Sequence, residues 1–155
     1  MTRFAVFLAT VAYCGYFPIA PGTVGSAAGL VVYLLVWWAH SPVFEVVLIL
    51  ALFGAGVWAG TTAERYFGGI DPGPIVIDEV VGMLITLAFI PVGLAGALLG
   101  FFIFRVFDVI KPYPSGRFEA WHGGLGVMAD DAMAAVYANL VLRGAVWLFP
   151  GWLVS

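Results

Sequence analysis

A run of 21 residues, 43–63, contains a single charged side chain, Glu45, close to one end. A helix needs about 20 apolar residues to cross the hydrocarbon core of a bilayer, so this run predicts a membrane-spanning helix. Hydrophobic residues make up 63% of the 155-residue chain, which is more than a soluble domain of this size can bury. A densely packed soluble helical bundle is the alternative. The apolar residues form long runs instead of amphipathic stripes, however, and this favours the membrane.

The other apolar runs predict an all-α fold, a compact multi-helix integral membrane bundle of about four to six helices, some short or partly penetrating. Residues 4–14 are too few to span a bilayer and predict an interfacial or buried short helix. The other expected helices cover 26–39, 78–90, 94–110 and 130–149. The helix 78–90 would be about 20 Å long, so its hairpin with 94–110 is expected to enter only part of the bilayer. We expect a single domain, residues 1–155.

Tracing these helices from side to side brings the loops 15–25, 64–77 and 105–131 to one face. Four of the six Lys and Arg residues lie in them: Arg65, Arg105, Lys111 and Arg117. The turns on the opposite face contain none. The positive-inside rule then predicts that the shared face is cytoplasmic. The same face collects nearly every acidic residue and the glycine-rich loops, which predicts a functional site there.

Two pairs of acidic residues each precede an apolar run. Asp78 and Glu79 begin one predicted helix, and Asp130 and Asp131 begin another. Helix capping explains one acid at each place well and two acids less well. With Asp108 they would gather five carboxylates on one face, which need a cation to avoid repulsion and protonation. Hard oxygen ligands of this kind favour Mg²⁺.

Basic residues accompany these acids at the end of the helix 94–110. Arg105 and Asp108 are three residues apart and therefore neighbours on one helical face. They form either a local ion pair at the membrane edge or a phosphate-binding arginine oriented by an aspartate. Lys111 precedes Pro112, which ends the helix and lets the lysine turn inward. Snorkelling of Lys111 to the lipid head groups is the alternative.

Three further polar residues are weaker candidates for phosphate binding. Thr23 and Ser26 lie in Pro-Gly-Thr-Val-Gly-Ser before a predicted helix, where they serve either as simple caps or as part of a phosphate cradle. His122 precedes two glycines and is either an ordinary loop histidine or a proton donor. Asn139 and Arg143 lie four apart inside the last helix, where we expect them to face the protein interior and support packing.

The sequence resembles the phosphatidylglycerophosphatase A family over nearly its whole length. The resemblance rests on four segments in the order and spacing of the family, residues 21–26, 71–82, 104–114 and 122–131. It implies an all-α fold with one central helix surrounded by others. It also implies a bacterial inner-membrane enzyme that removes the terminal phosphate of phosphatidylglycerol phosphate, with Mg²⁺ required.

The residues and the resemblance together give a functional hypothesis. Acidic residues hold Mg²⁺ (Asp78, Glu79, Asp108, Asp130 and Asp131), and all of these except Asp130 are also expected to be catalytic. Phosphate is bound by Arg105, Lys111, Thr23, Ser26 and His122. A metal-coordinated water attacks phosphorus, with a carboxylate nucleophile as the alternative. The lipid's acyl chains stay in the bilayer while its head group enters from the cytoplasm.

Other classes of function are weighed against this hypothesis. A small membrane transporter would distribute its charged residues through the depth of the membrane, whereas here they cluster at one face. A phosphatase acting on another lipid phosphate, such as phosphatidate, remains a second alternative. The net charge of −3 argues against nucleic-acid binding. The first 12 residues resemble a signal peptide, but residues 13–18 lack a clean cleavage site, so we expect them to be retained.

Overall fold

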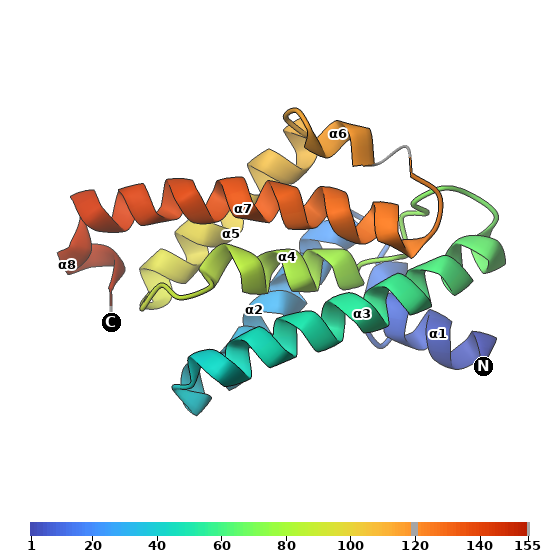
Figure 1. Ribbon diagram of the computed structural model, residues 1–155, viewed down its shortest axis with the longest axis horizontal. Coiled ribbons are helices and arrows are strands. Elements are labelled where there is room, and N and C mark those ends of the chain that lie inside the picture. Colours follow the sequence, from blue (N-terminus) through green and yellow to red (C-terminus); the bar gives the residue numbers. More distant parts are fainter. Residues whose placement is uncertain (119–120, 155) are drawn as a thin grey trace.

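The computed structural model describes residues 1–118 and 121–154, and these form a bundle of helices (Figure 1). The long helices are α2 (Pro21–Ala39), α3 (Pro42–Phe67), α5 (Leu94–Ile110) and α7 (Gly124–Leu148). Shorter elements are α1 (Thr2–Ala9), the 3₁₀ turn η1 (Cys14–Tyr16), α4 (Ile77–Leu87), α6 (Ser115–Phe118) and α8 (Pro150–Leu153). The prediction of an all-α bundle is confirmed. The short elements η1, α6 and α8 were not predicted from the sequence.

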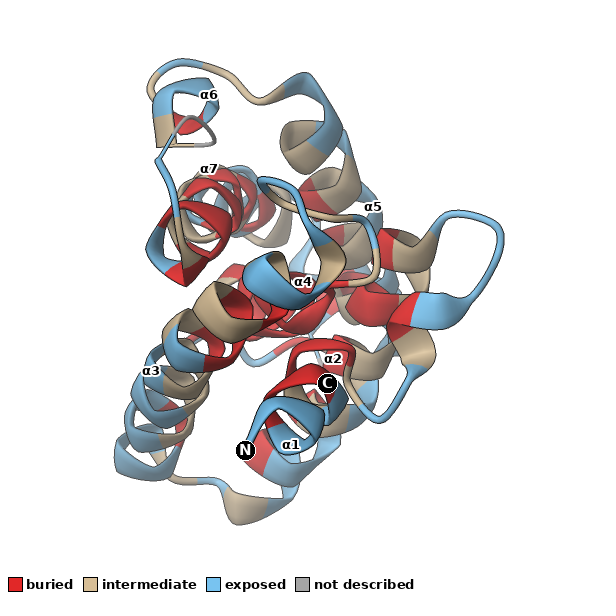
Figure 2. Cartoon of the chain, turned by 90° about the vertical axis from the view of Figure 1, so that its right-hand side faces the viewer, coloured by how far each residue is buried: buried red, intermediate tan, exposed pale blue. Residues whose placement is uncertain are grey.

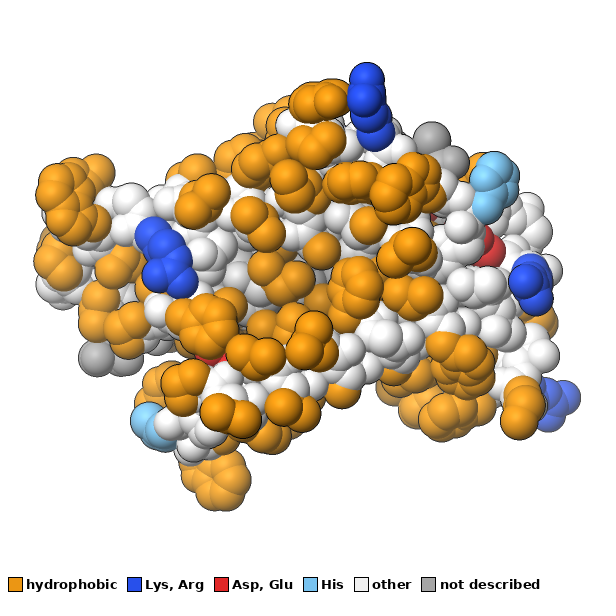
Figure 3. Space-filling view, viewed as in Figure 1, with side chains coloured by type: hydrophobic (Ala, Val, Ile, Leu, Met, Phe, Trp, Pro, Cys, Tyr) orange, Lys and Arg blue, Asp and Glu red, His pale blue; other side chains and the backbone are white. Residues whose placement is uncertain are grey.

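Within the described residues, three helices are long and apolar enough to cross a membrane: α2, α3 and α7. The turn between α2 and α3 is formed by a C-cap residue and an N-cap residue. His40 adopts a left-handed conformation that ends α2, and the Ser41 hydroxyl accepts a hydrogen bond from the backbone N–H of Phe44 at 3.3 Å. Hydrophobic side chains are spread over much of the face shown in the space-filling view, as expected for a protein surrounded by lipid (Figure 3).

Helix α4 is the centre of the bundle. Every residue of α4 except Ile85 is buried, and the burial map shows it enclosed by the other helices (Figure 2). Its 11 residues span only about 16 Å, roughly half of the hydrocarbon core. Gly82 lets the ring of Phe104 approach closely, since a Cβ at this position would lie 2.4 Å from the ring. The central helix implied by the family resemblance is therefore α4, and at 11 residues it is too short to cross a bilayer by itself.

Two predicted helix starts are wrong. Helix α2 begins at Pro21 instead of Ser26, and α7 begins at Gly124 instead of Asp130. Both added segments are rich in glycine, which suggested loops, but their glycines allow close packing between helices. A Cβ on Gly124 would lie 2.2 Å from the carbonyl oxygen of Val57 on α3. The segment 113–129, within the predicted loop region 105–131, is likewise partly helical, and residues 119–120 of it lie outside the described residues.

The end of the bundle away from α4's N-terminus is held by polar contacts to the turn after α4. The Asn139 side-chain amide donates to the carbonyl oxygens of Ile85, Thr86 and Ala88 at 3.0–3.1 Å. Arg143 donates to the Ala88 carbonyl at 3.0 Å and to the Asn139 side-chain oxygen at 2.8 Å. Both side chains thus cap the C-terminal end of α4, in agreement with a packing role. Asn139 is partly buried, but Arg143 is exposed, so the expectation that both face the protein interior is wrong for Arg143.

Candidate active site

The predicted co-location of the charged loops is realised at the N-terminal end of α4. The start of α2, the connector after α3, the first turn of α4, the end of α5 and the third turn of α7 meet there around a cleft of about 300 Å³. The cleft is lined by Ala20, Pro21, Gly22, Asp71, Gly73, Ile75, Asp78, Glu79, Arg105, Asp108, Val109, Lys111 and Asp131. Six of the predicted site residues lie in this lining.

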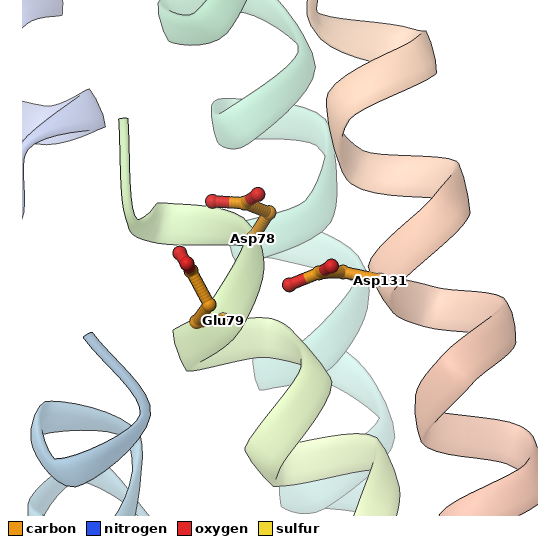
Figure 4. Close-up of side chains that lie close together, drawn as sticks. All are labelled: Asp78, Glu79 and Asp131. Carbon is orange, nitrogen blue, oxygen red and sulfur yellow. The ribbon is translucent and has the colours of Figure 1, made fainter. Parts of the chain in front are cut away.

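Three carboxylates converge in the cleft. Asp78 and Glu79 project from the first turn of α4, and Asp131 projects from α7 toward them (Figure 4). One oxygen from each lies within 4.8 Å of the other two. All three side chains are buried, and within residues 1–118 and 121–154 one oxygen of each has no hydrogen-bond partner: Asp78 Oδ1, Glu79 Oε2 and Asp131 Oδ2. Unpartnered buried carboxylate oxygens are rare and costly in folded proteins.

The two acids on α4 are strongly perturbed. Burial, together with the nearby charge of Asp131, raises the pKa of Glu79 from 4.5 to about 8, although Arg105 partly opposes this. Burial, together with the adjacent Glu79, raises the pKa of Asp78 well above its usual 3.8. Either protons or a cation must therefore neutralise this cluster near neutral pH. A divalent cation would satisfy the same oxygens that lack hydrogen bonds.

Arg105 brings positive charge to the edge of the carboxylate cluster. Its guanidinium lies 2.5 Å from Asp108 Oδ2, one turn further along α5, and 3.8 Å from Glu79 Oε1. It also donates to the Ser26 hydroxyl at 3.5 Å. The predicted local ion pair and the predicted orientation of Arg105 by Asp108 are one arrangement, because the paired arginine lines the cleft.

Lys111 and Asp130 form a separate pair beside the cleft. Lys111 Nζ lies 2.7 Å from Asp130 Oδ2, and Lys111 adopts a left-handed conformation that turns the chain at the end of α5. The Ser115 hydroxyl donates to the Asp130 backbone carbonyl at 2.9 Å. Asp130 therefore lies outside the cluster of Asp78, Glu79 and Asp131, although all four were predicted as metal ligands. Its carboxylate serves to hold Lys111 at the cleft wall.

The structure separates the three weaker phosphate-binding candidates from the cleft lining. Ser26 is buried inside α2, where its hydroxyl donates to the Gly22 carbonyl at 2.9 Å and accepts from the Arg105 guanidinium. Thr23 is partly buried in the first turns of α2 and does not line the cleft. His122 is exposed and also lies outside the lining. Because α2 already begins at Pro21, the loop predicted before Ser26 is wrong, and it is Pro21 and Gly22 at the start of α2 that line the cleft. A phosphate-binding role for Thr23, Ser26 and His122 stays a prediction.

One charged residue of the cleft, Asp71, was assigned no role from the sequence. Asp71 lines the cleft beside Asp78 and adopts a left-handed backbone conformation with φ of 45°. Its backbone N–H donates to Glu64 Oε1 at 3.2 Å, and Glu64 Oε2 accepts from the backbone N–H of Gly123 at 2.8 Å. Glu64 thus ties the connector to the start of α7. The Asp-Pro-Gly-Pro turn that starts at Asp71 was the available signal.

The fold and the cleft define a class of protein: a small integral membrane helical bundle with a buried carboxylate site at one end. The sequence model described as Phosphatidylglycerophosphatase A matches residues 7–146, and the chain belongs to this family. It is accordingly a phosphatase. No solved structure matches the chain significantly.

Three named relatives are similar over most of their length. Phosphatidylglycerophosphatase A of Escherichia coli is 36% identical over 130 residues, which cover 83% of this chain and 75% of that protein. Phosphatidylglycerophosphatase A of Haemophilus influenzae is 40% identical over 127 residues, 79% of this chain and 77% of that protein. A Bacteroides thetaiotaomicron protein with the provisional name phosphatidylinositol-3-phosphatase is 32% identical over 141 residues, 86% of this chain and 88% of that protein.

Proposed function

We propose that this chain is a Mg²⁺-dependent lipid phosphatase that hydrolyses phosphatidylglycerol phosphate to phosphatidylglycerol and inorganic phosphate in phospholipid biosynthesis. The observation that carries the proposal is the convergence of Asp78, Glu79 and Asp131 beside Arg105 in one cleft. Family membership supports the phosphatase class, and two relatives carry the name of this activity.

The donor set of the cleft fits a magnesium ion. Three carboxylates supply hard oxygen ligands, and the three unpartnered buried oxygens mark where positive charge is missing. Asp78, Glu79 and Asp131 would hold the ion, and Asp108, which is paired with Arg105, lines the cleft beside them. When bound, Mg²⁺ would neutralise phosphate charge and make an attacking water more acidic. A net acidic cleft binds a phosphomonoester, which carries nearly two negative charges, only with such help.

The side chains of this chain have distinct roles in the hydrolysis. Arg105 binds non-bridging phosphate oxygens through its planar fork, while Asp108 keeps the guanidinium aimed at the cleft. Lys111, held by Asp130, adds a second positive charge at the wall. Water attacks phosphorus in line, the bond from phosphorus to the glycerol oxygen breaks, and that oxygen takes up a proton. Asp71 also lines the cleft, and its carboxyl group is the one we assign to moving a proton beside the cluster.

The cytoplasmic face of the bacterial inner membrane is the proposed location of the cleft. The chain is a bacterial membrane protein by its family and its three span-competent helices. Arg105 and Lys111 lie at the cleft, and Arg65 and Arg117 lie in or next to the same group of loops. Positive residues concentrate on cytoplasmic loops. Arg143, at the other end of α7, is engaged in capping α4.

A second candidate substrate is a phosphatidylinositol phosphate. It is favoured by the name of the Bacteroides thetaiotaomicron relative, which is aligned over the largest share of this chain among the three. Both substrates present a phosphomonoester at a lipid head group, so the same cleft chemistry serves either. The two differ in the bulk and the hydroxyl groups next to the phosphate.

The proposal is tested with purified protein in detergent micelles. Phosphate release is measured from phosphatidylglycerol phosphate, phosphatidate and phosphatidylinositol 3-phosphate, each with Mg²⁺, with EDTA, and with Mg²⁺ restored. We expect the highest kcat/KM for phosphatidylglycerol phosphate and complete loss of activity with EDTA that Mg²⁺ reverses. Full activity after exhaustive chelation would refute the metal dependence. A higher kcat/KM for either other lipid would reassign the substrate.

A further inference from the structure

A second hollow lies between α2 and α5, further from the cleft toward the end of α2 and the start of α5. It has a volume of about 390 Å³ and an almost entirely apolar lining that includes Leu30, Leu34, Trp37, Ala97 and Leu98. Tyr33 and Val92 form its buried floor. The Tyr33 hydroxyl donates to the Ile90 carbonyl, so even this polar atom is engaged within the protein. We call this hollow the α2–α5 groove.

The groove and the cleft are two ends of one seam. On α2, Gly22 lines the cleft, and Ser26, Leu30, Leu34 and Trp37 follow it at intervals of three or four residues. Residues with this spacing share one face of a helix. The face of α2 that borders the cleft therefore continues along the groove.

Helix α5 repeats this arrangement in the opposite direction. Asp108 and Arg105 line the cleft, and Phe101, Leu98 and Leu94 follow toward the start of the helix at the same spacing. The contact from Arg105 to the Ser26 hydroxyl joins the two helices between the polar and the apolar parts. A ligand that is polar at one end and apolar at the other would match this seam along its length.

The depth of the groove matches one lipid leaflet. Along α2, Leu30 and Trp37 lie about 12 Å and about 22 Å beyond Gly22 at the helical rise of about 1.5 Å per residue. Half of the hydrocarbon core is about 15 Å thick. The groove thus lies where the acyl chains of a phospholipid run when its head-group phosphate is in the cleft.

We propose that the α2–α5 groove is an acyl-chain subsite, which binds one fatty-acyl chain of the phospholipid whose phosphomonoester occupies the cleft. This inference rests on the proposed function and adds a determinant for the lipid portion of the substrate. Binding along the seam fixes the lipid at two points, so the groove positions the phosphate next to Arg105. Bulk lipid or a second copy of this chain are the rival occupants.

The test compares substrates that share a head group and differ in chain length. Ala97→Phe fills the groove from its wall, and Leu98→Trp narrows it from the exposed rim. Ala95→Phe is the matched control, because Ala95 is exposed, points about 200° around α5 from Ala97, and does not line the groove. The readout is kcat/KM for a dioleoyl substrate divided by kcat/KM for a dihexanoyl substrate in the same detergent.

We expect this ratio to fall about tenfold in Ala97→Phe and Leu98→Trp, the loss expected when about two methylene groups are excluded from apolar contact. Ala95→Phe should keep the wild-type ratio, and the short-chain substrate should be hydrolysed at wild-type rates in all variants. An unchanged ratio in both groove variants would overturn the subsite. A larger particle size for wild type than for both variants, with an unchanged ratio, would show a second copy as the occupant. The proposed function is judged separately, by wild-type hydrolysis of the short-chain substrate.

Discussion

Gly22 is the residue at which a single added methyl group tests the geometry of the active site. It lies in the first turn of α2 and lines the cleft opposite the Arg105–Glu79 pair. A Cβ built on Gly22 would lie 2.2 Å from Glu79 Oε1 and 3.0 Å from Arg105 Nη1. Both atoms are at the ends of flexible side chains, so Gly22→Ala should displace them without moving a helix.

The size of the effect follows from these distances. Ordinary contact with a Cβ begins near 3.4 Å, so the Glu79 carboxylate must shift by about 1 Å, a misplacement that can cost about 100-fold in rate. Folding should not suffer, because alanine favours the helix over glycine by up to about 1 kcal/mol. We therefore expect Gly22→Ala to lower kcat by about 100-fold while its melting temperature stays the same or rises.

The assay is phosphate release across a Mg²⁺ titration, with thermal unfolding measured in the same detergent. Gly73→Ala is the matched control: Gly73 also lines the cleft, but a Cβ there meets no described atom within 4 Å. It should keep wild-type activity and Mg²⁺ dependence. Wild-type kcat in Gly22→Ala would refute the reasoning, because Glu79 and Arg105 could then not be where the reaction occurs.

Three further predictions concern the charged groups. Asp78→Asn and Asp131→Asn should each lower kcat at least about 100-fold, since even residues that only support metal ligands often matter by about 10- to 100-fold. Asp130→Asn should keep the wild-type Mg²⁺ requirement. Equal effects of all three substitutions in a Mg²⁺ titration would contradict the separation of Asp130 from the cluster. Arg105→Lys should lower kcat/KM at least about tenfold, because one charged hydrogen bond is worth about 1.5–3 kcal/mol and lysine lacks the planar guanidinium. Steady-state kinetics measure this, and an unchanged kcat/KM would exclude Arg105 from phosphate binding. Without divalent cations, thermal stability should fall as the pH rises from 4.5 toward 8, because Glu79 keeps its proton up to a pH of about 8 in the folded chain and loses it near 4.5 in the unfolded chain. Melting curves in EDTA measure this fall, and Mg²⁺ should reverse it. A melting temperature that does not change with pH would contradict the prediction.

Much of the site follows from the sequence through simple geometry. The apolar runs determine which segments cross the membrane, and alternation between faces then brings Asp78, Arg105 and Asp131 to one end. The pairing of Arg105 with Asp108 follows from their spacing on a helix. These predictions succeed because each depends on helix periodicity and the thickness of the bilayer, which hold whatever the neighbouring helices do.

The errors come from glycine-rich segments whose structure is decided by packing. Gly22 and Gly124 suggested loops, because glycine is unfavourable inside an isolated helix. In the bundle they allow contacts that a larger residue would block, so both segments are helical. Placing the start of α7 at Asp130 also put Asp130 and Asp131 in the same first turn. Inside a helix, adjacent residues point about 100° apart, and the two acids accordingly face Lys111 and α4.

Helix α7 explains how a helix as short as α4 can hold a reactive site inside a membrane. A helix end buried in lipid is unstable unless its free backbone groups find partners. At the C-terminal end of α4, Asn139 and Arg143 of α7 bind the free carbonyl oxygens and complement the partial negative charge there. At the N-terminal end, the partial positive charge favours the acidic Asp78 and Glu79, and Asp131 of α7 faces them.

One long membrane-competent helix therefore fixes both ends of the central helix. Asp131 and Asn139 are eight residues apart on α7, about 12 Å, and they contact opposite ends of α4. A shift of α4 along its axis would therefore disturb both contacts. Asn139, which is partly buried, and Arg143, which is exposed, thus support the active site through α4. This role accounts for both side chains without a transport pathway.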